Sequence, residues 1–255
     1  MKKKILLSLA TLAVSVTTLP LFAAFEAHVI NVTARIENAL YVHPQSLGYG
    51  TVFPQEHLDS SFFLSFSESF SATSQTRVGK VNYAIKQKPK PREDKVASLG
   101  GVEKARDWCH THIPDPIYSG VATSTEAWST FYTNCYPSLC PFLSKHPDKL
   151  PATGPNANND HGLPAFHNPE LEVASGTIVK FNNPASPLVT TGNDPADTWT
   201  IDLAVPCFKG YCAQDWASFV HGLNPTANPD NFMVPPELEH QTFGCDLWVE
   251  VTKIY

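Results

Sequence analysis

Alternation of apolar and polar residues is the dominant pattern along this chain. It occurs in six segments, which are residues 28–36, 62–70, 81–85, 177–181, 199–205 and 247–251. Side chains at every second position of a strand point to the same face of a sheet, so each segment predicts a strand with one buried and one solvated face. Strands of this kind are typical of antiparallel sheets, and we expect an all-β sandwich.

Two stretches depart from the alternation. Residues 88–172, approximately, are rich in Pro, Asn, Asp, Ser and His, and they predict a long loop insertion held by disulfides. After Cys212, the i, i+3, i+4 spacing of Trp216, Phe219 and Val220 predicts one short helix that ends near Gly222. Strand segments lie on both sides of the insertion, which favours a single domain over residues 25–255.

The N-terminus has the organisation of a signal peptide. Residues 2–4 are all Lys, and an apolar run follows over residues 5–16. We expect a signal peptide of residues 1–24 and a mature protein that is secreted or held at the cell surface. The alternative is an uncleaved anchor, because residues 5–25 lack charge and are about long enough to span a membrane.

The charge balance argues against a nucleic-acid partner. The formal net charge of the full chain is -6 at pH 7, and loss of the three signal-peptide lysines lowers it to -9. An acidic protein is repelled by phosphate backbones and by anionic lipid. We therefore expect no nucleic acid among the partners, and membrane contact only through an uncleaved signal segment.

Six cysteines follow the export segment, and their even number behind a signal peptide predicts disulfides. Six cysteines allow 15 sets of pairs, and the sequence alone leaves the choice open. The short turn around Gly210 favours a bridge between Cys207 and Cys212. For the other four, one arrangement joins Cys109 to Cys135 and Cys140 to Cys245.

Several residue groups suggest metal binding, each with a simpler interpretation. His110 and His112 adjoin Cys109, and His161 and His167 flank a Pro-rich loop, but no paired zinc motif is present, and we interpret them as surface histidines of loops. Asn158, Asn159 and Asp160, with Asp148 nearby, offer oxygen ligands for calcium. They lack the order of a calcium loop, and turn formation is the favoured interpretation. We expect no metal ligand and no cofactor.

Catalytic motifs are also missing from the sequence. There is no G-x-S-x-G elbow and no H-E-x-x-H motif. Asp202 and Asp246 could share one outer face, as glycosidase carboxylates do, although solvated strand faces explain them more simply. We therefore expect no enzyme and no catalytic residue, and a secreted hydrolase is the least favoured function.

Aromatic residues outside the predicted core suggest a binding surface. Trp248, Trp108, Trp128 and Tyr132 could form a platform on which sugar rings stack, with a surface glycan as partner. The alternative is ordinary packing beneath the insertion. A carbohydrate- or ligand-binding module is the second function that we consider.

Five passages resemble a group of uncharacterised bacterial exported proteins: residues 27–37, 47–56, 205–216, 235–240 and 244–251. The N-terminal part also resembles, more distantly, the TasA/camelysin family of secreted fibre and surface proteins. That resemblance rests on the Ala-Ala-Phe end of the export segment, the strand directly after it, and a Gly-x-Val-x-Pro turn at residues 50–54. The usual Ser-Asp after the aromatic residue is Glu26-Ala27 here.

The resemblance implies a jelly-roll-like sandwich that assembles into extracellular fibres and lends its N-terminal strand to a neighbour. In that arrangement Ile30, Val32 and Ile36 would fill pockets of the neighbouring copy, although the strand could instead pair within its own chain. Camelysins have been classed as metalloproteases, but no metal motif matches, so no catalytic residue is carried over. The leading expectation is a secreted structural or surface-assembly protein.

Overall fold

The computed structural model describes residues 37–72, 77–113, 125–150, 159–180 and 194–255, with the backbone alone for residues 125–127. The chain divides into two compact units, Met1–Glu37 and Asn38–Tyr255, and the sheets described belong to the second unit. The expected signal peptide and first strand lie outside the described residues. Among the described helices, none has the length and apolar character needed to cross a membrane.

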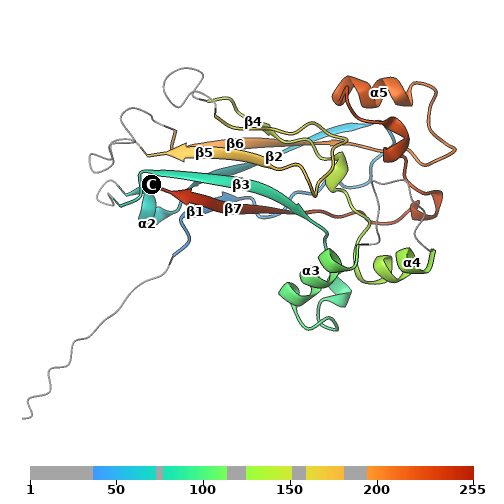
Figure 1. The fold of residues 1–255 in the computed structure, drawn as a ribbon, viewed down its shortest axis with the longest axis horizontal. Helices are drawn as coiled ribbons and strands as arrows, with labels where there is room; N and C mark the ends of the chain where they lie inside the picture. The colour runs from blue at the N-terminus through green and yellow to red at the C-terminus, as the bar shows by residue number, and fades with distance from the viewer. Residues whose placement is uncertain (1–36, 73–76, 114–124, 151–158, 181–193) are drawn as a thin grey trace, which may run out of the picture. The chain divides into compact units, whose positions relative to one another are not determined.

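Two antiparallel sheets contain the described strands (Figure 1). The four-stranded sheet has the order β1-β2-β6-β4, and the three-stranded sheet has the order β5-β3-β7. Their bounds are β1 Leu40–His43, β2 His57–Phe66, β3 Lys80–Lys88, β4 His146–Pro147, β5 Ala174–Val179, β6 Ala196–Ala204 and β7 Asp246–Ile254. The prediction of an antiparallel β protein is confirmed.

One core lies between the inward faces of the two sheets. Leu64, Trp199 and Ile201 of the four-stranded sheet and Tyr83 and Ile85 of the three-stranded sheet are at most 1% exposed and belong to the same buried cluster. These are positions that the alternation assigns to buried faces. The pattern of period two therefore identified the core of β2, β3 and β6 correctly.

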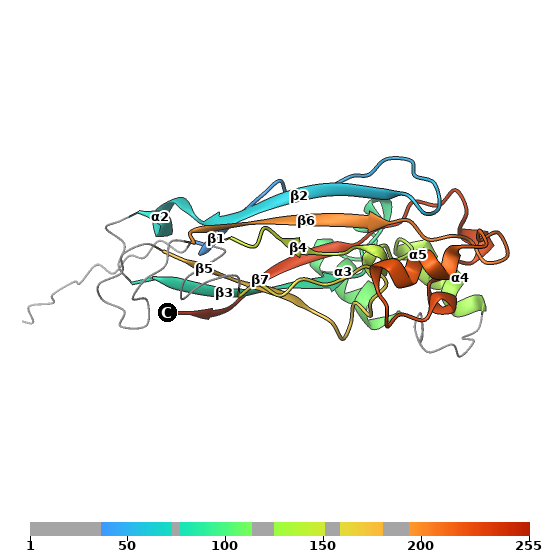
Figure 2. The same cartoon turned by 90° about the horizontal axis from the view of Figure 1, so that it is seen from above.

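Helices gather mainly at one end of the sheets. Figures 1 and 2 show α3, α4 and α5 near one end and the short α2 near the other. The α-helices are α2 Glu68–Ser71, α3 Val102–Thr111, α4 Thr125–Asn134 and α5 Trp216–Leu223, and the 3-10 helices are η2 Glu93–Lys95, η3 Cys140–Phe142, η4 Pro229–Phe232 and η5 Pro236–Leu238. The helix predicted after Cys212 is confirmed as α5, although it runs one residue past Gly222.

The prediction of only one helix is wrong, because the segment of residues 88–172 contains α3 and α4. It is also more than a loop, since Phe142 and Phe166 are buried in the same core as the strands. The Phe166 ring lies edge-on to that of Trp216 at 5.5 Å. The segment therefore contributes Phe142 and Phe166 to the common core.

Two strand predictions differ from the structure. The strand expected over residues 62–70 ends at Phe66, because the Ser67 carbonyl accepts hydrogen bonds from the Phe70 and Ser71 amides and starts a helical turn. In β5 the inward residues include Gly176, which pairs with Tyr83, rather than Thr177. A side chain at position 176 would clash with the Tyr83 hydroxyl, so the position requires glycine.

Three disulfides join Cys109 to Cys135, Cys140 to Cys245, and Cys207 to Cys212. The structure contains the favoured Cys207–Cys212 bridge, and the other four cysteines form the one arrangement named for them among the pairings left open. Cys109–Cys135 ties α3 to the residue after α4, and Cys140–Cys245 ties η3 to the residue before β7. Oxidised cysteines fit an oxidising compartment such as the extracellular space.

The long bridge should contribute more stability than the short one, because it closes the larger loop of the unfolded chain. Cys140 and Cys245 are 105 positions apart, whereas Cys207 and Cys212 are 5 apart. Replacing Cys140 and Cys245 with Ala should lower the free energy of unfolding by about 4 to 5 kcal/mol, against about 2 kcal/mol for Cys207 and Cys212. Urea unfolding followed by Trp fluorescence measures both, and equal losses would contradict the loop-length argument.

Candidate functional site

The outer edge of β7 is the first candidate site. Among the described residues, β7 pairs only with β3, so its other edge has no strand partner. Its register pairs Val249 with Ile85 and Val251 with Tyr83. Paired residues point to the same face of a sheet, so these valines point toward the core.

The inward face of β7 is apolar but incompletely covered. Val251 is 40% exposed and Ile254 is 50% exposed. Their partners on β3, Tyr83 and Val81, are at most 1% exposed. An unpaired edge with exposed apolar residues on its core side is a template for another strand.

The start of β7 is held firmly in place. The Cys140–Cys245 disulfide precedes it, and the Arg106 Nε donates a hydrogen bond of 2.9 Å to Asp246. On the outer face, the Trp248 ring is covered by the Lys88 Nζ, 3.3 Å from the ring centroid, and the Arg106 guanidinium lies at 5.3 Å. The exposed half of β7 is therefore its C-terminal half.

A groove lined largely by apolar residues is the second candidate. Its volume is about 670 Å³, and it lies beside α4, η3, η4 and η5. The Trp128 and Tyr132 rings stack at 5.3 Å on its α4 side. The other lining residues are Ser129, Thr133, Pro137, Ser138, Pro141, Phe142, Asn231, Phe232, Met233, Val234, Pro235, Glu237, Leu238, Gln241 and Phe243.

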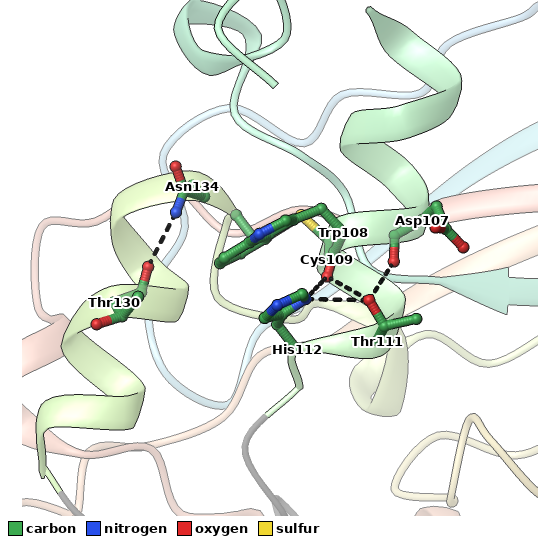
Figure 3. The surroundings of a disulfide bond; sticks show 8 residues. Asp107, Trp108, Cys109, Thr111, His112, Thr130 and Asn134 are labelled. Carbon is green, nitrogen blue, oxygen red and sulfur yellow. Dashed lines mark hydrogen bonds between the residues drawn. A yellow bond between two sulfur atoms is a disulfide. The ribbon is translucent and has the colours of Figure 1, made fainter. Parts of the chain in front are cut away.

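The Cys109–Cys135 disulfide anchors α4 at the groove. Cys109, Phe131 and Cys135 form a separate small cluster, and Trp128 and Tyr132 pack against it. Figure 3 shows Trp108 and His112 stacked beside Cys109, with ring centroids 4.2 Å apart. This disulfide therefore fixes the side of the groove that carries the aromatic rings.

The predicted four-residue aromatic platform is only partly present. Trp108, Trp128 and Tyr132 pack around the same disulfide. Trp108 stacks on His112 and Trp248 is covered by Lys88, and neither of these two rings lines the groove. The groove pair Trp128–Tyr132 remains as the candidate for stacking.

The histidine zinc hypothesis is not supported by the geometry. Cys109 is oxidised, and the His112 Nδ1 is hydrogen-bonded to the Trp108 carbonyl at 2.9 Å. His167 is 2% exposed, so it is a core residue rather than the surface residue that the sequence suggested. Among the described residues, no His or Cys belongs to a group that could hold a metal ion.

The two carboxylates proposed as an acid pair are separated. Asp202 lies on β6 of the four-stranded sheet and Asp246 on β7 of the three-stranded sheet. Asp202 lies 3.4 Å from the His57 Nδ1, and Asp246 accepts from Arg106. The glycosidase arrangement is therefore wrong, because the two side chains do not share a face.

The structure brings together two of the four residues suggested as calcium ligands. Asp148 and Asp160 do lie close together, and Asp197 joins them. Asn159 is exposed, and Asn158 lies outside the described residues. The sequence pattern did not single out Asp197, although alternation along β6 places it on the same buried face as Trp199 and Ile201.

A buried polar network completes the set of candidates. The Lys145 Nζ donates to the Gln87 Oε1 at 2.9 Å, and the Gln87 amide donates to the His167 Nε2 at 2.8 Å. Burial, aided by the nearby Lys145, lowers the pKa of His167 to about 3. Burial lowers the pKa of Lys145 to about 7, and Glu172 opposes that shift. The network positions interior side chains, and none of its three residues lines the groove beside α4.

The chain was compared with protein-family models, curated proteins and solved structures, and no match was found in any of the three.

Lys145 predicts a pH dependence of stability. Its folded pKa of about 7 lies below the ordinary Lys value of 10.5, so between these pH values the unfolded chain binds more protons than the folded one. Stability from this group therefore rises with pH across that window, by at most about 1.4 kcal/mol per pH unit. Urea unfolding from pH 6.5 to 10 should show this rise in the unsubstituted protein relative to Lys145→Met. A difference between the two that does not vary with pH would refute it.

Proposed function

We propose that this protein is a secreted structural subunit of an extracellular surface assembly. In this proposal its jelly-roll-like sandwich accepts a strand from a neighbouring copy along β7. The observation that carries the proposal is an edge of β7 that no described strand pairs with, together with the exposed inward residues Val251 and Ile254. An added strand would satisfy the edge backbone groups and cover the apolar side chains.

The N-terminal strand is the proposed occupant. Ile30, Val32 and Ile36 alternate with polar residues, as a strand with one buried face requires. The strand follows the export segment directly, so signal-peptide removal would leave it close to the new chain end. The resemblance to the TasA/camelysin family supports the same arrangement.

Geometry also determines what kind of assembly would result. The donor strand and the acceptor edge are different surfaces of one chain, so the contact is head-to-tail. Such contacts give rings if the rotation closes and open filaments if it does not. If the strand instead pairs with β7 of its own chain, the edge is closed and the protein stays monomeric.

Blocking the apolar face of β7 should prevent assembly. Protein lacking residues 1–24 should form filaments, whereas the same protein with Val251→Lys should stay monomeric because a charged side chain would be buried beneath the added strand. Thr252→Lys is the matched control, since Thr252 is an exposed neighbour at the bulge. Light scattering after size exclusion and negative-stain microscopy measure the outcome.

A truncation tests the occupant directly. A protein of residues 38–255 should stay soluble, fail to polymerise, and bind an added peptide of residues 26–37. Binding should be lost when Ile30, Val32 and Ile36 of the peptide are changed to Ser. A protein lacking residues 1–24 that remains monomeric at high concentration at every pH tested would rule out the strand-exchange proposal.

Ligand binding is the second candidate function, and the stacked Trp128–Tyr132 pair in the groove favours it. An aromatic face beside hydroxyl and amide groups suits a sugar or another ring-bearing ligand. On a glycan array, Trp128→Ala should reduce binding by about tenfold or more, the loss expected when a stacking contact worth at least about 1.4 kcal/mol is removed. Tyr211→Ala, 81% exposed and outside the groove, should bind like the unsubstituted protein. Equal binding by both variants would remove the groove from consideration.

A further inference from the structure

Three aspartates from separate parts of the chain meet at one point between the sheets. Asp148 follows β4, Asp160 precedes the bridge of His161 with Ser175, and Asp197 lies on β6. One carboxylate oxygen from each lies within 4.8 Å of those of the other two. Two oxygens bound to one Ca²⁺ at 2.3–2.6 Å can be at most about 5 Å apart, so this spacing suits a shared ion.

Asp197 is the unusual member, because it occupies a core position. It is 0% exposed, and its Oδ1 has no hydrogen-bond partner among the described residues. The Oδ2 of Asp160 is also buried, and no described residue forms a hydrogen bond with it. Buried carboxylate oxygens without donors are costly, so two such oxygens in one cluster favour the binding of a cation.

The remaining oxygens of these aspartates are held by the protein. The Tyr83 hydroxyl donates to the Asp197 Oδ2 and itself accepts from the Trp199 Nε1 at 2.8 Å. The Thr177 amide donates to the Asp160 Oδ1 at 2.9 Å. Both oxygens of Asp148 accept backbone amides, the Oδ1 from Leu150 and the Oδ2 from Thr198, each at 3.1 Å. These bonds orient the three carboxylates, as outer-shell groups do around metal ligands.

The electrostatics agree with the geometry. The charged groups that shift the pKa of Asp197 are Asp160, Asp194 and Asp148, and all of them are carboxylates. Burial, together with these like charges, raises the pKa of Asp197 to about 8. A cation at this point would balance the negative charge that burial and crowding otherwise oppose.

We propose that Asp148, Asp160 and Asp197 bind a hard divalent cation, with Ca²⁺ as the ion of an extracellular setting. The donors are all oxygens, which suit Ca²⁺ rather than the softer transition metals. The ion would link β4, β6 and the segment before β5, and therefore the two sheets. This site is independent of the proposed assembly edge on β7.

Terbium luminescence tests the proposal, because Trp199 and Tyr83 lie beside the site as energy donors. Chelator-treated protein should give saturable Tb³⁺ emission that Ca²⁺ displaces, with a Ca²⁺ dissociation constant of about 10⁻⁴ to 10⁻³ M, typical of extracellular sites. Ca²⁺ should also raise the midpoint of thermal unfolding. Absence of saturable emission in the unsubstituted protein would overturn the proposal.

Matched variants locate the ion. Asp148→Asn and Asp197→Asn should each weaken Ca²⁺ binding by about tenfold or more, because each removes one ligand charge. Asp107→Asn is the control, since Asp107 is exposed on α3 and lies outside the cluster. Asp148 is also exposed, so its variant should fold even if Asp197→Asn does not, and circular dichroism checks both. Equal Ca²⁺ affinity in Asp148→Asn and Asp107→Asn would refute the site.

Discussion

The contact between Trp199 and Tyr83 holds the two sheets in a fixed relationship. Trp199 belongs to the four-stranded sheet and Tyr83 to the three-stranded sheet, and their rings meet edge to face at 6.4 Å. The indole also donates to the tyrosine hydroxyl, so one pair supplies both apolar burial and a satisfied polar bond. Gly176 leaves space for that hydroxyl, and Asp197 accepts from it.

Both candidate sites on the sheets depend on this contact. The Tyr83 hydroxyl holds Asp197 within the acidic cluster, and Tyr83 lies on β3, the strand that pairs with β7. β7 is thus an edge strand of a sheet whose neighbouring strand, β3, is already buried against the core. The aromatic groove is supported differently, by a local disulfide and the small cluster around it.

Much of this architecture could be predicted from period-two alternation, because strands that are buried on one face show it directly. The helices α3 and α4 were missed although Ala105, Trp108 and Cys109 have the same i, i+3, i+4 spacing that identified α5. The polar, Pro-rich composition of residues 88–172 favoured a loop over helices in the prediction. Asp148 and Asp160 of the acidic cluster could be grouped from the sequence, whereas Asp197 could not, because β6 reaches them only through tertiary pairing.

The Cys140–Cys245 bridge has a consequence for resistance to proteolysis. It encloses the chain from η3 to the start of β7, and the described core residues Phe166, Trp199 and Ile201 lie within that span. A single proteolytic cut anywhere between the two cysteines leaves the fragments covalently joined. The pieces then stay at high effective concentration, so one proteolytic nick within that span does not release a fragment.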